Sequence, residues 1–330
     1  MTRVIALGSV DEAQDVAEEW GRLHANGSSD IFTSPAWCLA SWRAFSDLGT
    51  PLLLIALDGA GVLLGALPLT NGQLGPSWPG SPLGDEHDVR VRCDQPASGV
   101  VSALLRAVPR VAESGKTVLT DVRPGGPLTC AAISRAGCPA PVMHLNDADP
   151  ELGALGCIPG WSRKRRRALH TAQLRLTESG RVTVQRLADP ASIAANVADF
   201  VRCRLASWAA RGRLGELPAM DRHPRFPEFL TDVGRGLAVG GHCLFAGLNL
   251  DGEPLAQALF FRSPGADLLY MSTYRPTAAR YSPSHLLLAE AAGMAVAGGV
   301  RVIELGRGDE PYKFALGAHT RYLRNVVLAP

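Results

Sequence analysis

Hydrophobic residues along this chain switch between helical and strand-like spacing, in an order that occurs twice. In the first half, Ser9 or Asp11 is expected to cap the first helix, and Ser34, followed by Pro35, the second. A hairpin with the turn DGAG follows, then a loop rich in proline and glycine. The predicted elements of this half are helices over 9–25 and 34–45, strands over 51–59 and 61–70, a helix over 98–114 and a strand over 116–124.

The second half repeats this order with clearer periodicity. Its hairpin sequence LDGEPLAQALFF echoes LDGAGVLLGALPL of the first half, which indicates a duplication. The predicted elements are a helix over 162–180, a strand over 181–189, helices over 189–212 and 224–241, a three-stranded meander over 242–276, a helix over 282–299, an apolar strand over 300–306 and a terminal strand over 320–330. Mixed sheets flanked by helices define an α+β fold. We expect domains at 1–148 and 149–318, and a terminal strand in 319–330.

Composition narrows the class of protein. A chain of 330 residues with 46% hydrophobic and 19% charged residues predicts a soluble, two-domain globular protein. No apolar run approaches the ~20 residues of a membrane span, so no membrane insertion is expected. The start MTRVIALGSVDEAQD turns acidic at once and lacks a signal-peptide core, which favours a cytoplasmic location. The net charge of +2 does not by itself indicate nucleic acid.

The cysteine pattern predicts neither a disulfide framework nor a metal site. The seven cysteines are scattered, their number is odd, and none forms a CxxC pair or lies at zinc-ligand spacing from histidines. Lysine is scarce, with three residues in the chain, so a retained lysine is more often one that is needed as a compact ammonium. One of the three, Lys313, ends the motif GRGDEPYK at 306–313.

Three features together resemble a known family: the repeated α+β halves, the helix start SRKRRR, and the motif G-x-G-D-E-x-Y-K after the penultimate strand. They are similar to CelD/BcsL-type acyltransferases, two-domain relatives of the GNAT acetyltransferases and of the Fem-type aminoacyltransferases of peptidoglycan synthesis. The resemblance covers most of the chain and is strongest over 159–313. It implies tandem, duplicated GNAT-like domains, each a mixed, mostly antiparallel sheet flanked by helices. In Fem-type relatives the last strand returns to the first domain, as 319–330 is expected to do.

The resemblance also points to a site for acetyl-CoA, the expected co-substrate, at the turn RYSPSH. The family's signature R/Q-x-x-G-x-G/A lacks its glycines here. Ser282 can still cap the helix, Pro283 suits its first turn, and the amides of Ser284 and His285 face an anion, with Arg280 adding charge. The alternative is an ordinary capped helix without a ligand.

The segment SRKRRR places five cations at a helix N-terminus, where the macrodipole opposes them. Consecutive residues circle a helix, so some of these cations face protein. Arg163 and Arg166 are the residues we expect at the cofactor. Protein carboxylates, a CoA 3′-phosphate, a phosphorylated substrate or a tRNA backbone would each satisfy such charges, and a solvated helix end is the alternative.

In GRGDEPYK, the glycines at 306 and 308 turn the chain sharply at the end of a strand. Acyl transfer to an amine needs a base, an acid and stabilisation of an oxyanion. Asp309 or Glu310 can supply the base, Tyr312 the acid and Lys313 the positive charge. Arg307 is expected to contact substrate. A purely structural loop is the alternative, with Asp309 as a cap and an Arg307–Glu310 ion pair.

Further candidates for substrate binding come from two other segments. Tyr270 and Tyr274 alternate along LLYMSTY and are expected to share one strand face with Ser272. In the first half, His87 and Asp88 lie in the loop GDEHD, where carboxylates flank the histidine and suit it to act as a base. The alternatives are a strand face turned to the core and a solvated acidic loop.

The prediction is an acyl-CoA-dependent N-acyltransferase, with acetyl as the expected acyl group and the amine of a small molecule as acceptor, working as a monomer or homodimer. No cysteine or serine lies in a nucleophile motif such as G-x-S-x-G, so direct attack is expected. Two alternatives stay open. One is an aminoacyl-tRNA-dependent transferase of Fem type, and the other is a non-catalytic polysaccharide-assembly protein.

Overall fold

The computed structural model describes residues 2–25, 31–94, 97–111, 117–147 and 153–328. The chain divides into two compact units, one made of residues 1–139 and 322–330 and the other of residues 140–321. The second unit therefore begins before residue 149, where the sequence analysis placed the boundary. The reason is a short strand at 142–144 that pairs within the second unit.

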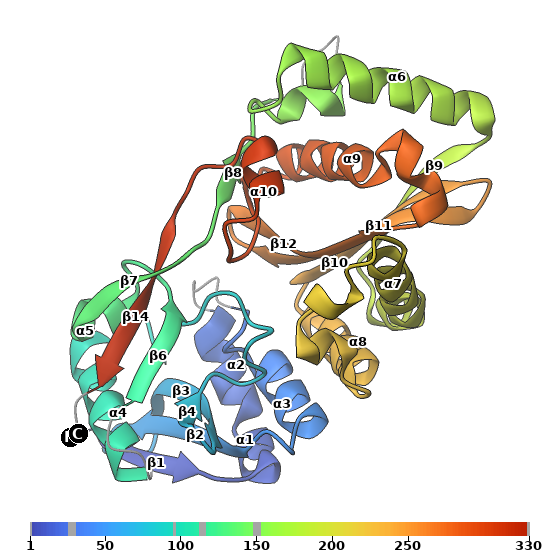
Figure 1. Ribbon diagram of the computed structural model, residues 1–330. Coiled ribbons are helices and arrows are strands. Elements are labelled where there is room, and N and C mark those ends of the chain that lie inside the picture. The colour runs from blue at the N-terminus through green and yellow to red at the C-terminus, as the bar shows by residue number, and fades with distance from the viewer. Residues whose placement is uncertain (1, 26–30, 95–96, 112–116, 148–152, 329–330) are drawn as a thin grey trace. The chain divides into compact units, whose positions relative to one another are not determined.

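The first unit has a five-stranded sheet and a separate three-stranded sheet, with helices around them (Figure 1). The strands β1, β2, β3 and β4 pair in that order, all antiparallel, with β5 also on β3; β6, β14 and β7 form a separate small sheet. The element bounds are β1 Arg3–Leu7, α1 Val10–Asp15, α2 Ala17–Ala25, α3 Pro35–Ala44, β2 Thr50–Leu57, β3 Leu63–Gly72, β4 Gly75–Ser77, β5 Arg90–Val91, α4 Ala97–Val111, β6 Thr117–Val122, α5 Pro127–Ala131, β7 Ser134–Pro139 and β14 Tyr322–Leu328.

Local sequence explains several boundaries in this unit. Ser9 caps α1 in a capping box with Glu12, and Ser34 caps α3 with Pro35 in its first turn, as the sequence predicts. The edge strand β1 was not predicted, because its five residues, three half-buried and two exposed, carry little periodicity. The terminal strand β14 lies between β6 and β7 of this unit, although the residues that precede it belong to the second unit.

The second unit has one sheet, in the order β8-β13-β12-β11-β10-β9, with helices on both faces (Figure 1). Helices α6 and α9 lie on one face, and α7 and α8 on the other. The bounds are β8 Val142–His144, η1 Ala154–Cys157, α6 Arg163–Ser179, β9 Val182–Leu187, α7 Pro190–Ala210, η2 Leu214–Glu216, η3 Ala219–Arg222, α8 Phe226–Val239, β10 Cys243–Leu250, β11 Glu253–Ser263, β12 Ala266–Tyr274, η4 Pro276–Tyr281, α9 Pro283–Ala297, β13 Val302–Glu304 and α10 Pro311–Ala315.

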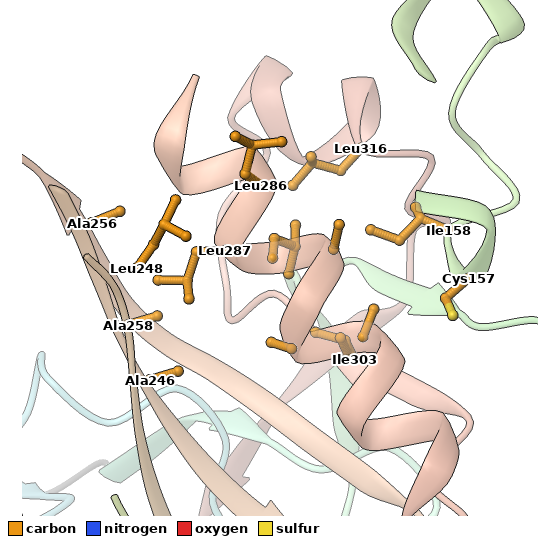
Figure 2. Packing of buried hydrophobic residues seen from close by; sticks show 14 of the residues in the cluster. Cys157, Ile158, Ala246, Leu248, Ala256, Ala258, Leu286, Leu287, Ile303 and Leu316 are labelled. Carbon is orange, nitrogen blue, oxygen red and sulfur yellow. The ribbon is translucent and has the colours of Figure 1, made fainter. Parts of the chain in front are cut away.

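Helix α9 forms the centre of this unit's hydrophobic core. Figure 2 shows small and branched side chains of β10 and β11 pointing toward it, while Ile158 and Leu316 approach it from the side away from the sheet. Leu286 and Leu287 are almost fully buried, and apolar residues surround the helix. Because most of its apolar residues are buried, α9 is firmly packed, and the turn that leads into it is held in place.

Strands β12 and β13 pair in parallel, whereas the other strand pairs of this sheet are antiparallel. Their register runs only from Ala266 opposite Val302 to Leu268 opposite Glu304. Beyond this point β12 continues to Tyr274, while the chain after β13 turns away into the segment 306–313. Strands β12 and β13 therefore separate at this point. The turn into α9 comes after β12, and the 306–313 loop comes after β13.

The predicted α+β class is confirmed: helices flank the sheets of both units, and the strand pairs are antiparallel in the first unit and mostly antiparallel in the mixed sheet of the second. A strand, helices, a run of strands, a helix, a strand and a short helix follow one another in each unit, as expected for tandem GNAT-like domains; the run is β2–β5 in the first unit and β10–β12 in the second. The seven cysteines, all within the described residues, are free thiols. Among the described residues, no helix is long and apolar enough to cross a membrane.

Candidate functional site

A cavity of about 290 Å³ lies in the second unit, between α6 and the turn from η4 into α9. The residues that line it are Arg165, Ala168, Leu169, Thr171, Ala172, Arg175, Arg280, Ser282 and His285. They include three arginines, and no carboxylate is found among these described lining residues. A half-open pocket with this charge is suited to an anionic ligand.

Helical spacing explains the α6 wall of this pocket. Arg165, Ala168, Ala172 and Arg175 recur at three- and four-residue steps, so they share one face of the helix. The adjacent buried residue Leu169 anchors that face to the core. The two alanines leave room, and the arginines stand at either end of the space.

The turn into α9 forms the opposite wall, with a geometry that corrects one expectation. Ser282 adopts a left-handed conformation, with φ of 50°, and its side chain makes no capping bond. Its carbonyl oxygen instead accepts from the amides of His285 at 3.0 Å and Leu286 at 3.2 Å. The cause is η4, which runs directly into α9 and leaves Ser282 no room for an extended cap conformation. Among the described residues, no acceptor lies within hydrogen-bond reach of the Ser284 amide, so this amide is open to an anion.

Arg165 and His285 meet inside the pocket. The Arg165 Nη2 lies 2.7 Å from the His285 Nε2. Arginine can only donate, so Nε2 is an acceptor and the neutral imidazole carries its proton on Nδ1. Burial, with the Arg165 charge as a second cause, lowers the pKa of His285 to about 4. Burial also lowers the pKa of the Arg165 guanidinium. At neutral pH the pocket thus holds an uncharged histidine beside arginine charges.

Arg280 stands at the rim of the pocket and is exposed to solvent. Its Nη2 donates to the Tyr281 hydroxyl at 2.8 Å, and its guanidinium lies over the same ring. The Ser179 hydroxyl, at the end of α6, lies 3.0 Å from that tyrosine oxygen. The bonds to Ser179 and Arg280 lower the pKa of Tyr281. These contacts tie the far end of α6 to η4 and hold Arg280 at the pocket mouth.

The loop 306–313 is arranged around Lys313. Gly306 and Gly308 have φ of 70° and 109°, which only glycine adopts without strain. The Lys313 side chain folds back under the loop and is 2% exposed as a residue. Its ammonium donates to the carbonyl oxygens of Gly306 at 3.2 Å and Arg307 at 2.6 Å, and it lies 2.9 Å from a Glu310 carboxylate oxygen. Three donors therefore meet three acceptors within the loop itself.

The predicted acid and base residues of this loop are on the surface. Asp309 and Glu310 are exposed, and Tyr312 is 55% exposed. The residue at the N-cap of α10 is Glu310, without a side-chain capping bond, so the expectation that Asp309 caps this helix is wrong. Glu310 pairs with Lys313, and this contact turns its carboxylate toward the loop instead of toward the helix amides. Arg307 is half-buried.

The two arginines predicted at the cofactor, Arg163 and Arg166, do not line the pocket. Arg166 donates to the carbonyl oxygens of Ile158 at 3.0 Å and Pro159 at 3.2 Å, which fixes the start of α6. Arg163 is exposed. The rotation of α6 is set by Leu169 and Leu176, and it turns Arg165 toward the pocket instead. Sequence reasoning missed Arg165, Thr171 and Arg175, although the helical spacing of 165, 168, 172 and 175 was a usable signal.

Tyr270 and Tyr274 do not share a strand face, because a β-bulge at Tyr270 breaks the alternation of β12. The Tyr270 ring stacks on Phe261 at 4.4 Å between centroids. Tyr274 lies opposite Ala256 and packs against the core around α9. Phe261 and Ala256 point to opposite faces of β11, so the two tyrosines do as well.

His87 and Asp88 belong to the interior of the first unit, and the structure does not place them in an open acidic loop. The His87 ring is 1% exposed and stacks on Trp78 at 4.7 Å. Asp88 accepts the amides of Val89 at 2.8 Å and Leu128 at 3.0 Å, which anchors the start of α5. Both residues take part in the packing of that unit.

Sequence and structure comparisons agree on the fold. Residues 163–314 match the family described as an acetyltransferase (GNAT) domain. The solved structure of FemX is 10% identical, covers 99% of this chain and 97% of its own, and superposes with a TM-score of 0.65. The C-terminal domain of a putative lysylphosphatidylglycerol synthetase from Agrobacterium fabrum is 11% identical, with coverage of 96% and 93% and a TM-score of 0.59. L-PGS from Bacillus licheniformis is 11% identical, with coverage of 93% and 90% and a TM-score of 0.56. No curated protein sequence matches the chain.

These likenesses establish a GNAT/Fem-like fold. The matched segment runs from the first residue of α6 to α10, and so includes the pocket and the 306–313 loop. The match to the acetyltransferase (GNAT) domain family thus lies within the second unit, and it supports acyl transfer as the class of reaction. Among the described residues, no group of three His, Cys, Asp or Glu side chains is arranged to hold a metal ion.

Proposed function

We propose that this protein is an acyl-CoA-dependent N-acyltransferase whose second unit binds the donor. The observation that carries the proposal is the pocket at the start of α9, with the guanidinium groups of Arg165, Arg175 and Arg280 around one cavity. The phosphates of CoA are the anions that a GNAT-type donor offers. The pocket suits these phosphates for a chemical reason. Arginines bind phosphate through paired N–H donors, and the Ser284 amide adds one more N–H donor at the start of a helix.

The expected reaction is direct attack of an amine on the thioester carbonyl. The C–N bond forms, the C–S bond breaks, one proton leaves the amine, and one proton reaches the departing thiolate. The exposed carboxylates of Asp309 and Glu310 are the proposed acceptors of the amine proton, and the Tyr312 hydroxyl is the proposed proton donor. Lys313 supports them by holding the loop, because its three donors are engaged there. Acetyl as the acyl group, a small-molecule amine as acceptor and a cytoplasmic location belong to this proposal.

Thermal unfolding in the presence of CoA tests donor binding. A ligand at about 100 times its dissociation constant adds roughly 2.7 kcal/mol, which raises the midpoint by several degrees. Arg175→Met should reduce this rise, because Arg175 lines the pocket. Arg167→Met is the matched control, since Arg167 is an exposed arginine on the same helix outside the pocket. An equal loss of the rise in both variants, or no rise in the wild type, would refute the proposal.

A second candidate function is aminoacyl transfer from tRNA. The observation that favours it is a group of exposed cations on α6: Arg163, Lys164 and Arg167 are exposed, and none of them takes part in the ion pairs found among the described residues. The likeness to FemX adds support at the level of the fold. Such a protein would bind tRNA with an affinity that falls steeply as salt rises, by a slope set by the number of phosphates contacted.

The two candidates respond differently to the same variants. Arg167→Met should weaken tRNA binding and leave the CoA effect unchanged, whereas Arg175→Met should do the reverse if the pocket holds CoA. Filter binding of a charged tRNA mixture between about 50 and 200 mM salt measures the first response. Failure to bind either donor would favour a non-catalytic role for the fold.

A further inference from the structure

We propose that Arg165 is a positioning residue that couples donor binding in the pocket to the order of the 306–317 segment. The inference rests on the proposed function, since it assigns a role within the same site. It goes further because it names one side chain as the mechanical link between the donor pocket and the loop that carries the proposed acid and base.

The first step is the place of Arg165 itself. Its two terminal nitrogens serve two different elements: Nη2 meets His285 of α9, and Nη1 donates to the Ala315 carbonyl oxygen at 2.7 Å. The guanidinium also lies 5.5 Å from the Trp161 ring centroid, and Trp161 is almost fully buried. His285, Ala315 and Trp161 therefore fix the plane of the Arg165 guanidinium. Arg165 also lines the pocket, so its remaining N–H groups are available to a ligand there.

The second step is what Ala315 belongs to. It is the last residue of α10, the short helix that contains Lys313. Lys313 holds the carbonyl oxygens at the beginning of the loop, and its own carbonyl accepts the amides of Leu316 at 3.1 Å and Ala318 at 3.3 Å. Movement of the α10 end is therefore transmitted to the segment that presents Asp309, Glu310 and Tyr312.

The third step is a close contact between backbones at the same place. A Cβ added at Gly317 would lie 2.3 Å from the Gly160 Cα, so the turn after α10 packs directly on the turn before α6. Gly317 itself has φ of 87°. The start of α6 and the end of α10 thus form one joint, with Arg165 as a hydrogen-bonded connection across it.

Physical chemistry gives the direction of the coupling. A guanidinium is planar and rigid, so an anion that fixes one edge also fixes the others. A phosphate in the pocket would accept from the guanidinium in bonds between two opposite charges, which are stronger than the bond from the same guanidinium to the neutral imidazole of His285. Donor binding should therefore hold Arg165 more firmly, strengthen its bond to Ala315 and lower the rate at which the 306–317 segment opens.

The test is hydrogen exchange of residues 306–318, measured with and without saturating CoA, in the wild type and three variants. Wild type should show slower exchange with CoA. Arg175→Met should bind CoA roughly tenfold more weakly, the effect of about 1.4 kcal/mol, yet keep the protection at saturation. Arg165→Met should bind CoA and lose the protection. Arg165→Lys keeps the positive charge but lacks the planar guanidinium. Compared with Arg165→Met, it should regain more of the affinity for CoA than of the protection of residues 306–318 from exchange.

Two outcomes separate this inference from the proposed function. If wild type fails to bind CoA, the proposed function fails. The comparison of variants without ligand then still tests whether Arg165 orders the 306–317 segment. Without ligand, Arg165→Met should speed the exchange of the Leu316 and Ala318 amides at least severalfold, and Arg175→Met should not. Equal exchange in both variants, or full CoA protection in Arg165→Met, would overturn the role of Arg165. With an acceptor amine in hand, Arg165→Met should lower kcat more than it raises the KM for CoA.

Discussion

Replacing Lys313 with methionine tests how the 306–313 loop keeps its shape. Methionine has a similar length and fills the same buried space, but it cannot donate to the carbonyl oxygens of Gly306 and Arg307 or pair with Glu310. The loop then loses the centre of its hydrogen bonding while its apolar packing stays nearly unchanged.

The expected size of the effect follows from the contacts. A hydrogen bond that involves a charged group contributes about 1.5–3 kcal/mol, and Lys313 makes two of these to carbonyl oxygens. The ion pair adds little, because the Glu310 side chain is 53% exposed and regains water. Removing a buried charge returns part of the cost of its desolvation. The net loss should be roughly 2–4 kcal/mol.

The assay is thermal unfolding combined with hydrogen exchange of the loop amides. A loss of this size should lower the unfolding midpoint of the second unit by roughly 5–10 °C and speed exchange over 306–318. Lys164→Met is the matched control, because Lys164 is exposed on α6, and it should change stability by no more than about 0.5 kcal/mol.

If Lys313→Met unfolds at the same temperature as Lys164→Met and exchanges its loop amides at the wild-type rate, the reasoning is wrong. The ammonium would then be dispensable to the loop. A direct role of Lys313 at the substrate would become the better explanation of any accompanying loss of activity.

Two further predictions concern the pocket and the joint beside it. His285 has its pKa lowered to about 4 in the folded protein, so the unfolded chain binds more protons between pH 4 and 6.5. The contribution of His285 to the free energy of unfolding should therefore be constant above pH 6.5 and fall by up to about 3 kcal/mol as the pH drops through that window. In denaturant unfolding, the His285→Gln variant should not show this decrease. Gly317→Ala should destabilise the second unit by more than about 2 kcal/mol, because the added methyl meets Gly160 at a positive φ. Gly215→Ala is the control in the same melting assay, since nothing lies within 4 Å of its added Cβ.

The sequence predicted most elements because their periodicity is strong and their ends carry local signals. Ser34 with Pro35, and Ser162 at the start of SRKRRR, act within a single turn of chain, so local chemistry is enough to find them. The same logic identified the turn at 280–285, where Arg280, Ser282 and His285 do line one cavity.

Features that depend on packing were not accessible in this way. Which cation of SRKRRR faces the pocket depends on the rotation of α6, and Leu169 and Leu176 decide that rotation. The face of the sheet to which Tyr270 points depends on a β-bulge, and no residue in the sequence predicts that bulge. From the sequence, Lys313 was expected to offer its charge to a substrate. Its ammonium instead binds backbone carbonyl oxygens, and every residue has such a group, so the sequence does not reveal these partners.

The central claim is that the basic pocket at the start of α9 binds the phosphates of an acyl-CoA donor. Calorimetric titration with CoA and with pantetheine, which lacks those phosphates, tests it most directly. We predict that wild type binds CoA at least tenfold more tightly than pantetheine, a difference of about 1.4 kcal/mol or more, and that Arg175→Met narrows this gap while Arg167→Met keeps it. Equal affinity for the two ligands, or a gap that survives in Arg175→Met unchanged, would contradict the claim.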